Sequence, residues 1–232
     1  MSKHEIARQG GAAEIADFVE RMRRLPAAGT RSGQGRLMFA LDATASRERT
    51  WDLACQVQNE MFVEAGRHGG LAVQLLFYRG FAECKASPWL HEGQDLVRLM
   101  RAVRCVAGKT QIHRVLRHAI GQARSQPVQA LVFVGDCMEE DTDALGQLAG
   151  ELGLLGTRMF LFHEGQNAAA ERCFRQLAGL TRGAYCRFAS GAAAELAALL
   201  AGVAAYAAGG AAAVAALPPR TEAVRLLQQQ LR

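Results

Sequence analysis

A group of oxygen-bearing side chains follows a strongly apolar segment near the start of the chain. Asp42, Thr44 and Ser46 come directly after the run Leu-Met-Phe-Ala-Leu at residues 37–41. A buried strand that ends in this way places three oxygen donors at its carboxyl end, which is where open α/β sheets form ligand sites. Taken alone, such a group is also typical of a strand-end turn with local side-chain capping.

Two further oxygen donors stand at comparable places later in the sequence. Thr110 lies in the sequence Ala-Gly-Lys-Thr at residues 107–110, and Asp136 follows the strand-like run 130–135. Three separate loops therefore offer hydroxyls and carboxylates, which are the ligands that a hard divalent cation such as Mg²⁺ prefers. It is the recurrence at three loops, more than the first group alone, that favours a metal site.

Strands and helices are predicted to alternate through the middle of the chain, and they would position these side chains. We expect buried strands at residues 37–41, 71–78, 130–134, 158–162 and 184–188. We expect helices at residues 50–65, 96–104, 111–124, 141–152, 168–180 and 192–206. Residues 81–89, which contain Pro88, are expected to form a short edge hairpin strand beside residues 71–78. This pattern indicates an α/β fold with a mostly parallel central sheet, helices on both faces and one short antiparallel edge strand.

The order Asp-x-Thr-x-Ser, then Gly-Lys-Thr, then Gly-Asp resembles the pattern of the von Willebrand factor type A (vWA) domain over about residues 34–206. In that family Asp-x-Ser-x-Ser, a Thr and an Asp form the metal-ion-dependent adhesion site (MIDAS). The residues at those five places are Asp42, Thr44, Ser46, Thr110 and Asp136. Thr44 stands where the family has Ser and keeps the hydroxyl, whereas Cys137 stands where the family often has Gly. The resemblance implies a Rossmann-like vWA fold.

The resemblance also implies how a metal would be held and used. Mg²⁺ (or Mn²⁺) would be ligated directly by Thr44 and Ser46, and by Thr110 in the ligand-bound form. Asp42 and Asp136 would act mainly through waters and hydrogen bonds to the hydroxyls. Neutral hydroxyl ligands leave much of the metal's charge uncompensated, and in the family a Glu or Asp side chain of another protein fills the open position. The expected function is metal-dependent protein binding, in an assembly or chaperone-associated role, with no enzymatic activity.

Charged residues are distributed unevenly around these loops. Residues 98–124 contain seven Arg or Lys side chains and no acid. Four of them are expected to form an electropositive rim that steers an acidic partner toward the metal, namely Arg101, Arg104, Lys109 and Arg114. A solvated helix face is the alternative interpretation. The acids after the last predicted ligand are expected to favour a helix N-terminus, namely Glu139, Glu140, Asp141 and Asp143.

Composition is consistent with one domain carrying extensions. The chain has 232 residues, of which 50% are hydrophobic, and its net charge is +5. The hydrophobic fraction is enough for a sizeable core. The net charge permits acidic partners but gives little reason to expect nucleic acid. The N-terminus lacks the apolar core of a signal peptide, and the six cysteines are scattered without a Cys-x-x-Cys pair. We therefore expect a bacterial-style cytoplasmic protein with reduced thiols, and neither zinc nor disulfides.

The sequence divides into three parts. Residues 1–34 are expected to be a helical extension, residues 35–206 the vWA domain, and residues 207–232 an Ala/Gly/Pro linker with a C-terminal amphipathic helix. The apolar face of that last helix offers a surface for self-association. The uncharged segment 196–217 is long enough to span a bilayer, but Ala and Gly dominate it. We therefore expect a buried helix followed by a linker, and no membrane contact.

Two enzyme-like or nucleotide-binding alternatives fit less well. A haloacid-dehalogenase-type phosphatase would use Asp42 as nucleophile, with Lys109, Asp136 and either Glu140 or Asp141 as further site residues. Such enzymes usually carry a second acid two residues after the nucleophile, and that place is held by Thr44, so the general acid is missing. A P-loop suggested by Gly-Lys-Thr would need a further Gly at the position of Val103.

A third alternative is a vWA fold that has lost its metal and acts as a scaffold. The departures from the family pattern at Thr44 and Cys137 keep this interpretation open. Whether Mg²⁺ changes the stability of the protein would separate it from the metal-binding interpretation.

Overall fold

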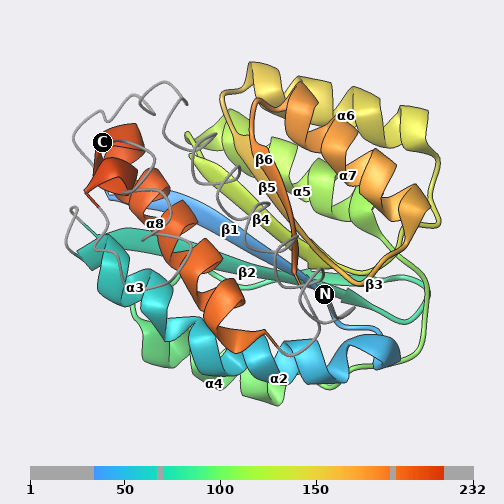
Figure 1. Ribbon diagram of the computed structural model, residues 1–232, viewed down its shortest axis with the longest axis horizontal. Helices are drawn as coiled ribbons and strands as arrows, with labels where there is room; N and C mark the ends of the chain where they lie inside the picture. The colour runs from blue at the N-terminus through green and yellow to red at the C-terminus, as the bar shows by residue number, and fades with distance from the viewer. Residues whose placement is uncertain (1–33, 67–69, 189–191, 217–232) are drawn as a thin grey trace, which may run out of the picture.

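A central sheet of six strands organises the protein. The structure, a computed structural model, describes residues 34–66, 70–188 and 192–216 (Figure 1). The strand order is β3-β2-β1-β4-β5-β6, with every neighbouring pair parallel except the antiparallel β2–β3 edge. The strands are β1 (Gly35–Asp42), β2 (Leu71–Arg79), β3 (Glu83–Ala86), β4 (Ala130–Gly135), β5 (Arg158–Glu164) and β6 (Ala184–Phe188). The predicted α/β Rossmann-like fold, including its antiparallel edge strand, is confirmed.

Helices cover both faces of this sheet, as Figure 1 shows. One layer consists of α2 (Glu48–Val57), α3 (Asn59–Gly66), α4 (Gly93–Ala102) and α8 (Ala193–Ala215). The other consists of α5 (Ile112–Ser125), α6 (Thr142–Leu154) and α7 (Ala168–Leu180). Successive side chains of β1 alternate between the two cores, because Leu37 and Phe39 join the first and Met38 and Ala40 the second. Burial on both faces explains why the strands read as continuous apolar runs.

The single helix predicted over residues 50–65 is divided into α2 and α3. The division falls at Gln58, which is fully buried. The Gln58 carbonyl accepts a hydrogen bond from the Met61 N–H at 3.1 Å, which is the i→i+3 pattern of a tighter turn. This local tightening separates two segments that have the same helical periodicity.

Helix α8 extends further than the sequence predicted. Residues 207–215, expected to be a linker, continue the helix across a break at Gly210, where φ is 69°. Alanine is the best helix former, so the composition that we interpreted as a linker supports a helix once packing is available. The helix backbone also packs closely on β1 at Gly35, since a Cβ there would lie 2.2 Å from the Ala207 carbonyl oxygen. The expected boundary at residue 206 therefore falls inside a buried helix.

Within the described residues, α8 is the one helix long and apolar enough to cross a membrane. That test is met over Ala193–Gly210, but 61% of this window is buried inside the protein. Its contacts with the sheet core are those of an internal helix of the domain. The predicted N-terminal extension, up to residue 33, and the predicted C-terminal helix within 217–232 lie outside the described residues.

Candidate metal centre

The predicted ligands converge at the carboxyl edge of the sheet. Strand β1 lies between β2 and β4, and the chain places β2 and β3 on one side of it before returning to build β4, β5 and β6 on the other. Asp42 is the last residue of β1, and Asp136 directly follows the end of β4. This reversal of strand order is a topological switch point, where open α/β sheets bind ligands.

A hollow of about 240 Å³ lies at this switch point. The predicted ligands Asp42, Thr44, Ser46 and Thr110 all line it. The fifth, Asp136, is adjacent in the chain to Cys137, which also lines the hollow. The structure therefore brings the three predicted loops together around one space.

The loop after β1 is fixed by its own hydrogen bonds. The Thr44 N–H donates to Asp42 Oδ1 at 2.8 Å, and the Thr44 and Ser46 hydroxyl oxygens are 3.3 Å apart. The Ala43 backbone joins both neighbouring segments, because its N–H donates to the Tyr78 carbonyl at 2.9 Å and its carbonyl accepts from the Val106 N–H at 3.0 Å. The hydroxyls are therefore held in place by backbone contacts before any ligand arrives.

The loop that carries Thr110 packs tightly against the turn between β2 and β3. A Cβ on Gly108 would lie 2.0 Å from the Gly80 carbonyl oxygen, so only glycine fits there without a backbone shift. The Lys109 N–H donates to that same oxygen at 3.1 Å. On the other side, the Thr110 N–H donates to Glu139 Oε2 at 3.2 Å, and the Glu139 N–H donates to Thr110 Oγ1 at 3.1 Å. Thr110 is thus tied to the loop that follows β4.

Two carboxylate oxygens at this centre are buried without a hydrogen-bond partner among the described residues. They are Asp42 Oδ2 and Asp136 Oδ1. The buried Tyr78 hydroxyl also has no hydrogen-bond partner among those residues, and burial together with the Asp42 carboxylate raises its pKa. Asp42 is only 3% exposed, and burial raises the pKa of its carboxyl, with the nearby charge of Asp136 acting in the same direction. A buried carboxylate without a partner is unfavourable. The chemistry of this donor set, hydroxyls together with two incompletely satisfied carboxylates, fits a hard divalent cation.

Cys137 also lines this hollow, and its thiol is held in the neutral form. Burial, reinforced by the charge of Asp136, raises the pKa of the Cys137 thiol to about 12. The thiol is therefore protonated at neutral pH, whereas metal ligation by cysteine uses the thiolate. In the part of the chain that the structure describes, no group of three or more His, Cys, Asp or Glu side chains is placed to hold a metal. The donors at this hollow are therefore hydroxyl oxygens together with the carboxylates of the Asp residues.

A buried ion pair lies beside the predicted ligands, and the sequence analysis missed it. Arg47 Nη1 is 2.5 Å from Glu164 Oε2 and 3.8 Å from Asp136 Oδ2. The Thr50 hydroxyl also donates to Glu164 Oε2. Arg47 directly follows Ser46, so its position in the sequence was a usable signal. Glu164 ends β5, and its proximity becomes visible only when the strand order is known.

The acids after β4 have different roles from one another. Asp141 caps α6 by accepting the Ala144 N–H at 2.7 Å, as the sequence predicted for this group. Glu140 instead accepts the N–H groups of Ile112 and His113 at 2.6 and 2.9 Å, so the helix N-terminus that it favours is that of α5. Glu139 lines the hollow and holds Thr110. The sequence analysis did not predict these two contacts because both cross between loops.

The predicted basic rim lies along the segment that crosses the carboxyl edge from α4 to α5. Its four members, Arg101, Arg104, Lys109 and Arg114, are all exposed. Arg101 lies in the last turn of α4 and Arg114 near the start of α5, where its Nη1 donates to the Ala82 carbonyl at 2.7 Å. Lys109 is adjacent to Thr110. These cations are therefore near the hollow along the chain, but none of them lines it.

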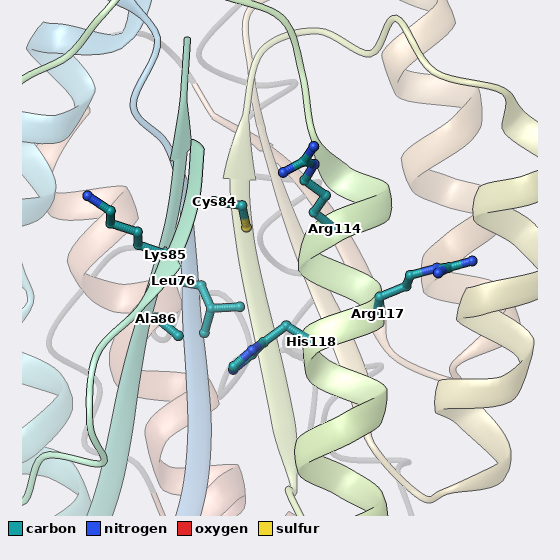
Figure 2. Close-up of a pocket in the computed structure, with 7 residues that line it drawn as sticks. All are labelled: Leu76, Cys84, Lys85, Ala86, Arg114, Arg117 and His118. Carbon is teal, nitrogen blue, oxygen red and sulfur yellow. The ribbon is translucent and has the colours of Figure 1, made fainter. Parts of the chain in front are cut away.

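A second hollow, of about 250 Å³, lies between β2, β3 and helix α5 (Figure 2). Its lining includes Lys85, Arg114, Arg117 and His118. Figure 2 shows the Lys85 and Arg117 side chains pointing away from each other, on opposite sides of the hollow. His118 Nε2 is 2.9 Å from the Gln74 side-chain oxygen, and burial lowers the pKa of this histidine. These residues do not form a convergent group of cations.

Comparison with known proteins shows the fold. No family model and no curated protein matches the sequence. Among solved structures, a von Willebrand factor type A protein from Catenulispora acidiphila matches with a TM-score of 0.63 at 12% identity, over 76% of this chain and 43% of that chain. The SpRpn10 VWA domain matches with a TM-score of 0.55 at 13% identity, over 72% of this chain and 94% of that one.

A third structure with this fold contains a metal. Proximal thread matrix protein 1 from the mussel byssus, solved with a zinc-occupied MIDAS motif, matches with a TM-score of 0.57 at 12% identity. That match covers 74% of this chain and 46% of the mussel chain. This chain thus spans less than half the length of the Catenulispora and mussel chains. The likenesses confirm the vWA fold that the motif resemblance implied.

Proposed function

We propose that this vWA module binds Mg²⁺ or Mn²⁺ at the carboxyl edge and uses it to bind an Asp or Glu side chain of a partner protein. The hydroxyls of Thr44, Ser46 and Thr110 would hold the metal, with Asp42 and Asp136 supporting it. When bound, the metal would supply a positive charge with an open position for an anionic oxygen. This is a binding function and includes no bond-making step.

One observation carries the proposal: Asp42, which lines the hollow, and Asp136, which precedes the lining residue Cys137, each have a buried carboxylate oxygen, Oδ2 and Oδ1, with no hydrogen-bond partner in the described part of the chain. Proteins satisfy nearly all buried polar atoms, so an exception requires an explanation. A cation in the hollow would compensate both oxygens at once. The zinc-occupied MIDAS of the mussel protein supports the idea that this fold can hold a divalent cation here.

The protein's own residues would keep the site ready for the metal. Asp42 uses Oδ1 to hold the Thr44 backbone, which leaves Oδ2 for the cation or its water. Glu139 exchanges two hydrogen bonds with Thr110, which fixes the distance between the second and third loops. Because these contacts are already formed, little rearrangement is needed when a ligand binds.

Thermal unfolding with Mg²⁺, Mn²⁺ or EDTA tests the proposal directly. A metal that binds only the folded state raises stability with its concentration. Asp42→Asn keeps the shape and an oxygen for the Thr44 N–H while it removes the charge. Asp143→Asn makes the same change at an exposed position on α6 and is the matched control. We expect a metal-dependent rise in wild type and in the control that is absent from Asp42→Asn; no rise in wild type would refute metal binding.

Partner binding is tested separately from metal binding. A partner recovered with the wild-type protein in Mg²⁺ should be released by EDTA and should not bind Asp42→Asn or Thr110→Val. Both variants should unfold cooperatively in EDTA, as the wild type does. A partner that binds all of these proteins equally, with or without EDTA, would show that the metal centre is not the binding surface.

A metal-free scaffold is the second candidate, and one contact favours it. Arg47 Nη1, 3.8 Å from Asp136 Oδ2, places a positive charge beside a predicted metal support without any ion. For a phosphatase, Glu140 or Asp141 would be the further acid, and these two side chains accept hydrogen bonds from the first turns of α5 and α6. The thermal experiment separates the scaffold from the metal-binding module.

A further inference from the structure

Arg47 is a buried cation directly beside the proposed metal centre. Arg47 is 3% exposed, although it directly follows the exposed Ser46 in the chain. Its guanidinium approaches two carboxylates through the same nitrogen, Nη1, which lies 2.5 Å from Glu164 Oε2 and 3.8 Å from Asp136 Oδ2. The closer contact is a charge-assisted hydrogen bond, and the longer one lies outside hydrogen-bond distance.

The Arg47 guanidinium is incompletely satisfied in this position. Its Nε and Nη2 atoms are buried and have no hydrogen-bond partner within the described residues. A guanidinium carries five N–H donors, so donors remain for a further acceptor. Asp136 Oδ1, on the carboxylate that Arg47 already approaches, likewise has no partner in that part of the chain. If the guanidinium moved slightly away from Glu164, one of its free N–H donors could therefore form a hydrogen bond with Asp136.

We infer that Arg47 competes with the metal for Asp136, and that Glu164 sets metal affinity by holding the guanidinium away from that carboxylate. This inference rests on the proposed function, because it names a regulator of the same site. Arg47 and Glu164 are not ligands in it. They determine how much negative charge Asp136 offers to a cation in the hollow.

The arrangement of charges gives this inference its direction. Two carboxylates, those of Glu164 and Asp136, lie within 4 Å of the buried Arg47 guanidinium, and the charge of Arg47 also acts on the more distant Asp42 carboxylate. Attraction between charges falls with distance and is strong where water is excluded. When Arg47 stays with Glu164, Asp42 and Asp136 retain their charge for a divalent cation. When Arg47 moves to Asp136, that carboxylate is neutralised and metal binding weakens.

The Thr50 hydroxyl shares the Glu164 oxygen that holds Arg47. Thr50 lies in the first turn of α2, so the Glu164 carboxylate is held by that helix as well as by its own strand.

Glu164→Gln keeps an oxygen for Thr50 and removes the charge that attracts Arg47. Arg47→Met with Glu164→Gln removes both charges and leaves the net charge of the protein unchanged.

Metal titration of the full chain tests the inference, with Mn²⁺ and Mg²⁺ as probes and the dissociation constant as the readout. We expect Glu164→Gln to bind Mn²⁺ about tenfold more weakly than wild type, because Arg47 turns to Asp136. We expect the double variant to bind about fivefold more tightly than wild type, because the competitor is gone. If the pair acted only through the net charge near the site, the double variant would have the affinity of wild type, and that result would overturn the inference.

Glu164→Asp provides a second test if the double variant does not fold. It conserves the charge but shortens the reach toward Arg47, so metal affinity should fall; an unchanged affinity would contradict the inference. If the Arg47–Glu164 pair were purely structural, its variants would have a lower unfolding temperature in EDTA, and the metal dissociation constant of the folded protein would be unaltered.

If wild type binds no metal, the proposed function fails together with this inference. If wild type binds metal, Asp42→Asn does not, and the Arg47 and Glu164 variants match wild type, only this inference fails.

Discussion

Two buried acids at the carboxyl edge of the same sheet have opposite environments. Glu164, at the end of β5, is 5% exposed and contacts both Arg47 and the Thr50 hydroxyl. Asp42, at the end of β1, is 3% exposed, yet its Oδ2 has no hydrogen-bond partner among the described residues. Paired buried charges belong to the internal structure of a protein, whereas an incompletely paired one at a switch point indicates a place for a ligand.

The incomplete pairing of Asp42 does not come from a loose loop. Its other oxygen holds the Thr44 N–H at 2.8 Å, and the following residue, Ala43, is bonded to both adjoining segments. The loop that follows β1 is therefore fixed by hydrogen bonds, as Glu164 at the end of β5 is. What differs is that a cation of the protein itself sits at β5, and that a hydroxyl-lined hollow opens at β1.

The largest expected effect comes from breaking the paired acid. Arg47→Met removes the cation beside Glu164 and leaves a buried carboxylate without its charge partner. We expect a loss of about 3–5 kcal/mol in the free energy of unfolding, measured by urea denaturation in EDTA. Arg47→Met with Glu164→Gln should recover part of this loss because no buried charge is left over. A loss below about 1 kcal/mol would mean that the pair is as weak as an exposed ion pair, and the contrast with Asp42 would fail.

A second prediction separates the geometry of the hollow from general packing. Gly108→Ala forces a Cβ to within 2.0 Å of the Gly80 carbonyl oxygen and should shift the Thr110 loop. Gly183→Ala creates a comparable clash, 1.8 Å from the Met159 carbonyl oxygen, at the amino edge of the sheet. Both should destabilise by about 1–3 kcal/mol. Only Gly108→Ala should also lose the thermal response to Mg²⁺; if both or neither lose it, the loop geometry is not what holds the metal.

The unpaired acid should behave in the opposite way to the paired one. Burial raises the pKa of Asp42 in the folded protein, so ionisation destabilises the fold as pH rises from the unfolded-state pKa through the folded-state pKa. At neutral pH in EDTA, Asp42→Asn should therefore be more stable than wild type, by about 1 kcal/mol. The difference should shrink as pH falls below the folded-state pKa, because wild-type Asp42 becomes protonated. Urea denaturation at several pH values measures this, and a less stable variant at neutral pH would contradict it.

The sequence predicted the fold elements, and with them where the oxygen-bearing side chains lie, for physical reasons that can be named. Buried parallel strands are continuous apolar runs, so the ends of β1 and β4 could be located, and Asp42 and Asp136 with them. Strand order could not be obtained in this way, and Glu164 becomes a neighbour of Arg47 only through that order, 117 positions later in the chain. Arg47 itself was overlooked because arginine is normally exposed, and its burial depends on that distant partner.

Long-range packing also explains the remaining differences. The Ala-rich end of α8 has the composition of a linker, but it is a helix whose backbone packs closely against β1 at Gly35, where the sheet strand has no side chain. The Glu139 contact with Thr110 joins two loops 29 residues apart, so local capping rules pointed to the wrong partner. Helices and strands could be predicted from the local periodicity of the sequence, whereas contacts between distant loops could be identified only once the fold was known.

The smallest expected effect compares a buried cation with an exposed one. Lys109 is exposed and adjacent to Thr110, so its charge should repel Mg²⁺ only weakly through water. Lys109→Gln should tighten Mg²⁺ binding about twofold at low salt, and the gain should vanish near 1 M salt, where the Debye length is about 3 Å. Arg182→Gln, at an exposed position on the opposite edge of the sheet, is the matched control and should change nothing. If Lys109→Gln changed affinity as much as the Arg47 variants do, burial would not be what gives Arg47 its influence, and the contrast between the two acids would have to be explained by distance from the metal alone.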